Sequence, residues 1–334
     1  MTTAKPDVGA HVIGASASRA VASIMVHVDW NAGSDERIRL AADLSDRFGA
    51  VLIGVAGWVP GRERAALAHA ELEQPEKRLK WIRAELDRLG ERFREVAGIT
   101  ALPTEWRGSF NFPREVIARE ARAADLVVIG CRPAADDVLH SFDPGEVLLA
   151  AGRPVLIAPQ GHAALSARRI LIAWKDTREA RRAVQSALPF LQQAEHVTLV
   201  EVAEDLLEAQ AQAHLADVEA YLGRHGVKVG VKAVLNPHGA IAHQLTTAAA
   251  DNGADLIVAG AYGHTRLGEW IFGGATRGLL HTSKLCSLFN LTFQDRAAIV
   301  QSRGPAAEIS VRNTQRTLRH CRVRIALRRR FDPR

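Results

Sequence analysis

The chain reads Asp255-Leu-Ile-Val-Ala-Gly260-Ala-Tyr-Gly263 and, after nine further residues, Gly273-Gly274-Ala-Thr276. An apolar strand thus runs into a Gly-x-x-Gly turn, and a second pair of glycines stands where a helix is expected to begin. Glycines let backbone N–H groups approach a phosphate closely, and the N-terminus of a helix adds partial positive charge. The stretch therefore predicts a buried strand, a phosphate-binding turn and a helix.

The same strand pattern occurs twice in the chain. Ala124-Asp125-Leu-Val-Val-Ile-Gly130 recurs as Ala254-Asp255-Leu-Ile-Val-Ala-Gly260. Each copy also has an apolar opening segment that suits a strand, at 23–28 and at 169–174. A tandem duplication of one α/β domain explains why these elements match in the same order.

The length and composition fit two globular domains. The chain has 334 residues, enough for two domains of about 150 residues that each bury a core. No apolar run approaches the roughly 18 residues of a membrane span, and the N-terminus has no secretory signal pattern. Cys131, Cys286 and Cys321 form no Cys-x-x-Cys pair, so we expect neither a disulfide framework nor a zinc site. These features predict a cytoplasmic protein without a membrane partner.

Apolar strand-like segments alternate with helical segments along both copies. Such alternation implies parallel pairing, because each crossover must travel back across the sheet. We therefore predict an α/β fold of two tandem Rossmann-like domains, each with a five-stranded, mostly parallel sheet. Ligands bind such sheets at the carboxyl ends of the strands, and the residues that fall at these ends are Asp29, Gly130, Lys175 and Gly260.

We expect the chain to divide into five parts. A loop of small and polar residues is the linker between the domains. The parts are an N-terminal lead (1–20), a first domain (21–160), the linker (161–168), a second domain (169–290) and an arginine-rich C-terminal tail (291–334).

The positive charge of the chain lies in the tail. Residues 291–334 hold eleven arginines against three carboxylates, a net charge of +8, whereas the whole chain has +6 and the rest is therefore at −2. A disordered extension is the interpretation we favour. Nonspecific binding of nucleic acid, through release of counterions from phosphates, and docking onto the domains stay open as alternatives. A nucleic-acid partner is expected only through the tail.

On these residues the chain resembles the universal stress protein family, in its tandem two-domain form. That family has a flavodoxin-like nucleotide-binding fold, and its ATP-binding members carry Gly-x-x-Gly, nine residues, then Gly-Ser/Thr. The second copy is similar to this motif at Gly260-Ala-Tyr-Gly263 and Gly273. The resemblance covers about residues 20–290.

The resemblance implies a site for ATP or AMP, with or without magnesium, in the second copy. Gly260, Gly263 and Gly273 would surround the ribose-phosphate, Gly274 and Thr276 would meet the phosphates, and Ala173, Trp174, Lys175 and Val202 would flank the adenine.

The second copy departs from the family pattern at two positions. Gly274 stands where the family has Ser or Thr, so one hydroxyl donor is missing, at a cost of about 0.5–1.5 kcal/mol. Lys175 stands where the family has an acidic residue. We expect weakened rather than abolished binding there.

The first copy departs further. Asp29 keeps the acidic position, but Cys131-Arg132-Pro133 replaces the Gly-x-x-Gly turn, and proline supplies no N–H. Three carboxylates follow that would repel a triphosphate, Asp136, Asp137 and Asp143. We therefore expect the first site to be degenerate, which leaves Asp29 as a weaker candidate.

We expect binding rather than catalysis, so the protein is not predicted to be an enzyme. The chain has no P-loop, no Gly-x-Ser-x-Gly elbow and no Gly-x-Gly-x-x-Gly fingerprint. His264 and Arg266 are weaker candidates for phosphate contacts that support slow ATP hydrolysis, with solvated loop residues as the alternative. His238 and His243 lack a third ligand, so no metal site is predicted.

Two functions remain open from the sequence. The first is an adenine-nucleotide-binding regulator of a stress response, with one competent site in the second domain and an unknown protein partner, acting through occupancy of the site. The second is a nucleotide-independent scaffold in which the duplicated domains form an internal pseudo-dimer. Assembly into a homodimer stays open in both.

Overall fold

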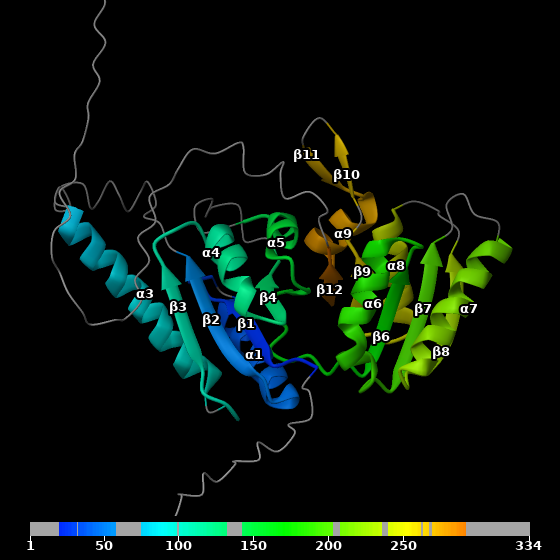
Figure 1. Ribbon diagram of the computed structural model, residues 1–334, viewed down its shortest axis with the longest axis horizontal. Helices are drawn as coiled ribbons and strands as arrows, with labels where there is room; N and C mark the ends of the chain where they lie inside the picture. Colours follow the sequence, from blue (N-terminus) through cyan, green and yellow to red (C-terminus); the bar gives the residue numbers. More distant parts are fainter. Residues whose placement is uncertain are drawn as a thin grey trace, which may run out of the picture.

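The computed structural model describes residues 20–31, 33–57, 75–98, 100–131, 142–202, 208–235, 240–261, 263–266 and 269–291. Ten strands form one sheet (Figure 1). They are β1 (Ser23–His27), β2 (Val51–Gly57), β3 (Glu105–Ser109), β4 (Leu126–Gly130), β5 (Val155–Ala158), β6 (Arg169–Trp174), β7 (His196–Val202), β8 (Val229–Leu235), β9 (Leu256–Gly260) and β12 (Cys286–Asn290). The lead 1–19 and residues 292–334 of the tail lie outside the described residues.

The sheet has two halves with the same internal order. The order is β3-β2-β1-β4-β5-β12-β9-β6-β7-β8, so each half runs from its outer edge through its third, second, first, fourth and fifth strands. All neighbours are parallel except β5 and β12, which pair antiparallel with Leu156 opposite Leu288. The predicted α/β class with a mostly parallel sheet is confirmed. The two five-stranded sheets that we expected are the halves of one sheet of ten strands.

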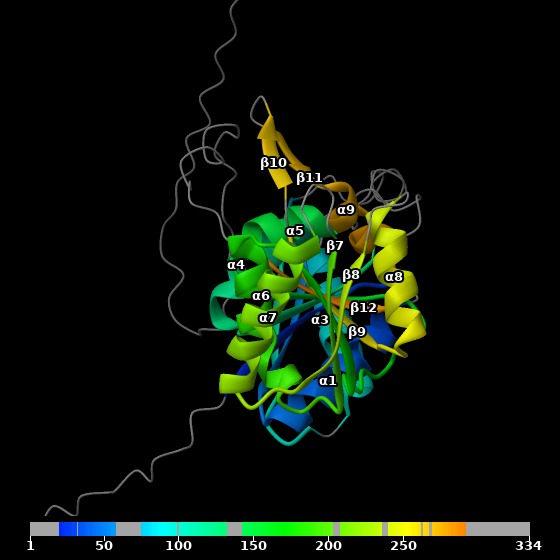
Figure 2. The ribbon, with the colours of Figure 1, turned by 90° about the vertical axis from the view of Figure 1, so that its right-hand side faces the viewer.

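Helices cover both faces of this sheet, as Figure 2 shows. Two clusters of buried apolar residues lie on opposite faces. The helices of the first cluster are α1 (Ser34–Phe48), α3 (Pro75–Ala97), α6 (Arg178–Leu191) and α7 (Glu208–Arg224). Those of the second are α4 (Pro113–Glu120), α5 (Pro144–Ala151), α8 (Ile241–Asp251) and α9 (Gly274–Thr282), with the short 3₁₀ turn η1 (Ala121–Ala123) after α4.

The two halves are also joined by side chains. Phe48 of α1 meets Phe190 of α6 edge to face, with ring centroids 5.0 Å apart. The guanidinium of Arg47 lies over both rings and donates hydrogen bonds to the carbonyls of Leu165 and Ser166. Aromatic pairs of this kind stabilise a contact beyond the effect of buried area alone. The hydrogen bonds from Arg47 hold the segment around 165 at the junction between the halves.

Two elements were missed from the sequence. Helix α5 is short, and Asp143 caps it by accepting a hydrogen bond from the Gly145 N–H at 2.7 Å. A hairpin of β10 (Gly263–Arg266) and β11 (Glu269–Phe272) forms where we expected a loop between two glycine turns. Figure 1 shows it projecting from the edge of the sheet where the strands end. Its β-branched and aromatic residues favour this conformation.

No helix in the described parts of the chain is long and apolar enough to cross a membrane. Helix α3 begins at Pro75, and residues 58–74 before it lie outside the described residues. It packs Ile82, Leu89 and Phe93 into the first cluster.

Candidate functional site

The end of β9 is packed against the start of α6. A Cβ atom placed on Gly260 would lie 2.4 Å from the Ala180 nitrogen and 2.7 Å from the Glu179 carbonyl carbon. These are backbone atoms, which cannot move aside without a shift of the helix. The close approach of the α6 backbone therefore explains why position 260 is a glycine, and this explanation requires no ligand.

The start of α9 is open. Gly273 is the N-cap residue, and no side chain caps the helix. Gly274 follows as the first helical residue, is exposed, and would carry a Cβ with no atom within 4 Å. The first N–H groups of a helix have no partner within it, and its positive end favours anions. This end of α9 can therefore accept a phosphate at Gly274.

Thr276 is the third residue of α9 and is only 4% exposed. Its buried position places it behind Gly274 on the inner side of the helix. Gly273, Gly274 and Thr276 therefore stand together, as the motif predicts, whereas Gly260 is separated from them by the hairpin in sequence.

The hairpin carries three of the residues that the sequence singled out. Gly263 pairs with Phe272, His264 with Ile271, and Arg266 with Glu269. Gly263 thus lies beside the residue that precedes Gly273. The side chains of His264 and Arg266 lie outside the described residues, so their part in a phosphate site stays a prediction.

The predicted adenine edge lies at the ends of β6 and β7. Trp174 is 8% exposed and packs in the first cluster, while Ala173 is half-buried and faces the second. Lys175 follows and is exposed. Val202 ends β7, and its side chain is outside the described residues. Within the described structure the indole N–H of Trp174 is buried and has no hydrogen-bond acceptor.

Glu201 is a polar residue at this edge that sequence reasoning missed. It lies opposite Trp174 in the pairing of β6 and β7 and is 1% exposed. Its Oε1 lies 3.2 Å from Nδ1 of His214, whereas its Oε2 has no partner among the described residues. Burial raises the pKa of the Glu201 carboxyl, Asp176 adds to the rise, and His214 opposes it. A glutamate inside the apolar strand segment His196–Val202 was the available signal.

The corresponding edge of the first half is closed by a charged side chain. Arg37 of α1 donates from Nε to the His27 carbonyl at 2.7 Å, and its Nη2 lies 3.1 Å from the Asp29 carboxylate. The side chains of Arg37 and Asp29 are 6% and 13% exposed. Burial would raise the pKa of Asp29, but Arg37 and a hydrogen bond from the Asn31 N–H hold it below its ordinary value.

His27 completes this network. Its Nδ1 lies 3.4 Å from Asp29, and its ring meets Phe142 edge to face at 5.0 Å. Burial lowers its pKa to about 4, although Asp29 opposes the shift, so the imidazole is neutral at pH 7. Its Nε2 is buried without a partner in the described structure.

A cavity of about 30 Å³ remains among these side chains, with His27, Asp29, Arg37 and Cys131 in its lining. That is room for one or two water molecules. A Cβ on Gly130 would meet Nη1 of Arg37 at 2.5 Å. The end of the Arg37 side chain therefore fills the space beside Gly130.

Other predicted features of the first site are partly outside the described residues. Arg132, Pro133, Asp136 and Asp137 are not described. Asp143 caps α5 and so has a structural role. Burial raises the pKa of the Cys131 thiol to about 11, so it is not a thiolate nucleophile at neutral pH.

Metal binding finds no support in the described ranges, which hold no group of three or more His, Cys, Asp or Glu side chains placed to bind an ion.

The sequence motif corresponds to a known family. Residues 166–286 match the model of the universal stress protein family. The match spans β6 to the start of β12, so the second half of the chain carries a universal stress protein domain. The resemblance inferred from the glycine spacing is thereby confirmed. No curated protein matches this chain.

Solved structures share the fold over most of the chain. A universal stress protein from Archaeoglobus fulgidus is 18% identical with a TM-score of 0.55, and the match covers 81% of this chain and 96% of that one. A protein of unknown function from Pseudomonas aeruginosa is 16% identical with a TM-score of 0.52, covering 81% and 93%. A universal stress protein in complex with cAMP is 23% identical with a TM-score of 0.30, covering 42% and 97%. At these identities the first two matches show the fold.

Proposed function

We propose that this protein is an adenine-nucleotide-binding regulator with one competent site, in a second domain at 169–290. The open N-terminus of α9 at Gly274 is the observation that carries the proposal. Because α9 follows β9 and the hairpin, it begins at the carboxyl edge of the sheet, where open α/β sheets bind ligands. In the described part of a first domain at 21–160, Arg37 occupies the edge beside Gly130.

The chain's own residues suggest how ATP or AMP would bind. The N–H groups of Gly274 and the next residue would donate to phosphate oxygens, in the favourable field of the helix end. Ala173, which is half-buried, and the ends of β6 and β7 would flank the base. Magnesium, where present, would neutralise phosphate charge.

Regulation would follow from occupancy. The hairpin of β10 and β11 ends one residue before Gly273, so a phosphate held at the start of α9 would bias the position of the hairpin. A partner protein that contacts the hairpin would then discriminate the bound from the free state. The protein would bind its nucleotide rather than turn it over, and any hydrolysis would be slow.

Titration calorimetry of magnesium-ATP into the full chain tests the proposal, with Gly274→Ser as the informative variant. The position has space for a side chain, and serine would add the missing hydroxyl donor. We expect about two- to tenfold tighter binding, the effect of one hydrogen bond. Gly263→Ala should abolish binding, as the motif requires.

Gly223→Ser is the matched control. Gly223 is an exposed residue of α7, and a Cβ atom placed on it would have no neighbouring atom within 4 Å, so the same substitution there should leave affinity unchanged. An affinity that is the same in the wild type, Gly263→Ala and Gly274→Ser would contradict the proposed site.

The second candidate function is a nucleotide-independent scaffold. The continuous sheet through β5 and β12 favours it, because this junction already joins the halves as a pseudo-dimer. Absence of heat in the titration, with unchanged tryptophan fluorescence, would support the scaffold over the nucleotide-binding regulator.

A further inference from the structure

A groove of about 1100 Å³ runs along β3, the outermost strand of the first half. Residues of α3 line one side of it, and residues of α4 and η1 line the other. In Figure 1, β3 stands at the outer edge of the sheet with α3 beside it. This groove lies in the other half of the sheet from the proposed nucleotide site.

The floor of the groove is a strand with one partner in the described structure. β3 pairs with β2 in parallel register, with Gly54 opposite Trp106 and Ala56 opposite Gly108. An edge strand presents N–H and C=O groups on its outer side that can pair with another strand. The backbone of β3 is therefore a template for an added strand.

Side chains of β3 alternate between the two walls. Trp106 turns to α3, where it stacks on Phe93 with ring centroids 5.7 Å apart. Gly108 lies on the same side, where a Cβ would be 3.2 Å from the Leu86 Cβ. Arg107 turns the other way and meets Glu120 at the end of α4. One wall thus carries apolar side chains beside charged ones of α3, and the other wall is charged.

The apolar wall consists of side chains from α3. Leu79, Ile82 and Leu86 line the groove together with Trp106. Ile82 and Leu86 are nearly buried, while Leu79 and Trp106 are partly exposed. An apolar side chain entering from an added strand would find an apolar surface here.

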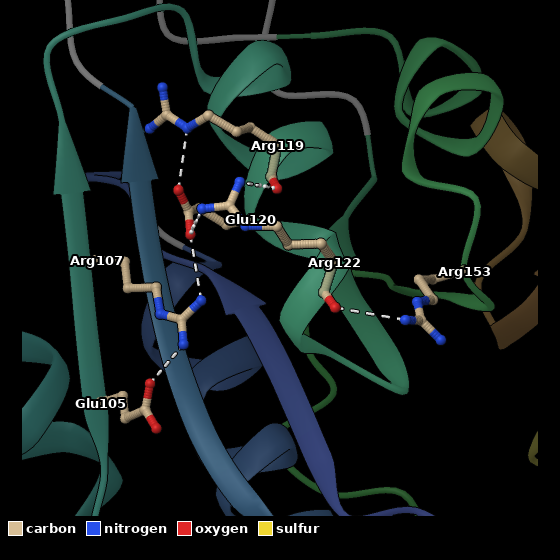
Figure 3. A network of polar contacts seen from close by, with 6 residues as sticks. All are labelled: Glu105, Arg107, Arg119, Glu120, Arg122 and Arg153. Atoms are coloured by element: carbon tan, nitrogen blue, oxygen red, sulfur yellow. Dashed lines mark hydrogen bonds and ion pairs between the residues drawn. The ribbon is translucent and has the colours of Figure 1, made fainter. Parts of the chain in front are cut away.

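The charged wall is a cluster of arginines around Glu120, and Arg107 also pairs with Glu105 at 2.6 Å (Figure 3). Glu120 accepts from Arg119 Nε at 3.0 Å and from Arg107 Nη1 at 3.2 Å, and Arg122 Nη2 lies 3.5 Å away. Burial would raise the pKa of Glu120, but the arginines hold it below its ordinary value. Three guanidinium groups share this carboxylate, so their donors are not exhausted by it.

The groove as a whole is positive. Five arginines and two carboxylates line it, a net charge of +3. Arg119 and Arg122 have side chains 29% and 52% exposed. Arg83 and Arg94 add exposed positive charge from α3.

We propose that this groove binds an acidic, extended segment of a partner protein, which adds to the sheet as a strand beside β3. Alternate residues of the segment are apolar and contact Leu79 and Trp106, and the residues between them are acidic and meet Arg119 and Arg122. A second copy of this chain is disfavoured because its β3 would bring the same positive groove. The phosphates of a nucleic acid could pair with the arginines, but a nucleic acid lacks the peptide N–H and C=O groups that would pair with the backbone of β3.

The test uses the full chain and a fluorescent peptide of about seven residues, a typical strand length, in which valine alternates with glutamate. Fluorescence anisotropy measures its affinity. Two matched peptides are the controls: one with lysine in place of glutamate, and one N-methylated at alternate backbone nitrogens. Each should bind at least about tenfold more weakly, because the first loses charge pairing and the second loses backbone donors.

Variants then locate the binding. Arg119→Ala with Arg122→Ala should weaken the peptide at least about tenfold, while Arg107 still pairs with Glu120. Arg88→Ala is the control, since Arg88 is 54% exposed on α3 and does not line the groove. Circular dichroism checks that each variant is folded, and the N-methylated peptide tests the wild type independently.

Two results would overturn the proposal. One is equal binding of the plain and N-methylated peptides, which would show that the peptide does not pair with β3 as an added strand. The other is tighter binding of a single-stranded oligodeoxynucleotide that competes with the peptide and depends on Arg119 and Arg122, which would make the groove a nucleic-acid site.

Discussion

The two halves of the sheet close the end of their fourth strand in different ways. In the second half, backbone atoms of α6 lie against Gly260, and the nearest is 2.4 Å from a Cβ placed there. In the first half, the end of the Arg37 side chain lies 2.5 Å from a Cβ placed on Gly130. The glycine at the end of the fourth strand is therefore packed against helix backbone in the second half and against an arginine side chain in the first half.

The difference extends to the first strand of each half. The pairing registers place His27 and Ala173 at equivalent positions, since Ile24 pairs with Leu126 as Ile170 pairs with Leu256. His27 is buried in a network with Asp29 and Arg37, whereas Ala173 is small and half-buried. The two halves therefore share a strand order, while the first half fills the edge beside its fourth strand with charged side chains.

The largest expected effect is the loss of Arg37. Arg37→Ala leaves Asp29 buried without its main partner, which typically costs about 3–5 kcal/mol in the free energy of unfolding. Chemical denaturation measures it. The matched control is Arg39→Ala, because Arg39 is exposed on the same helix, and a surface substitution should cost about 0.5 kcal/mol or less. Equal losses in the two variants would show that Arg37 does not close the first half.

The next effect is the contribution of His27, in the first half, to the pH dependence of the free energy of unfolding. The pKa of His27 is lowered from 6.5 to about 4, so the folded state favours neutral imidazole. Its contribution is full above pH 6.5 and is lost as pH falls toward 4, by about 3 kcal/mol. In His27→Phe the free energy of unfolding should vary less with pH over this range than in the wild type. His225→Gln, a change at an exposed histidine of the second half, should retain the wild-type slope. A His27→Phe slope equal to that of the wild type would contradict the prediction.

The smallest effect compares the two glycines directly. Gly260→Ala forces a shift of α6 and should cost about 3 kcal/mol, whereas Gly130→Ala meets the movable end of Arg37 and should cost about 1 kcal/mol. Thermal unfolding of both variants measures the difference. A larger loss of stability for Gly130→Ala than for Gly260→Ala would contradict this prediction, because it would show that Arg37 is a more rigid neighbour than α6.

Sequence patterns predicted most of the fold. The opening strands expected at 23–28 and 169–174 are β1 and β6, and the strands expected before Gly130 and Gly260 are β4 and β9, because each is a continuous apolar segment. Helix α5 was missed because it is only eight residues long. The hairpin was missed because its residues were assigned to a phosphate loop from their glycine spacing alone.

The site was predicted less completely. Gly273, Gly274 and Thr276 are adjacent in sequence, so their grouping at the start of α9 follows from local structure. Arg37 gave no such signal, because it is one of many arginines on amphipathic helices and only its contact with Asp29 distinguishes it. Glu201 stands out in the sequence as a charged residue within an apolar strand segment, but it was not among the predicted site residues.

The amino-acid sequence by itself determined the α/β class and the similarity of residues 166–286 to the universal stress protein family, because these rest on periodicity and on motifs read over short distances. Only the tertiary structure decided that β5 and β12 join the halves into one sheet, that Arg37 fills the edge of the first half, and that a charged groove flanks β3. Each depends on residues distant in sequence, such as Leu156 and Leu288, whose contacts arise from packing of whole elements.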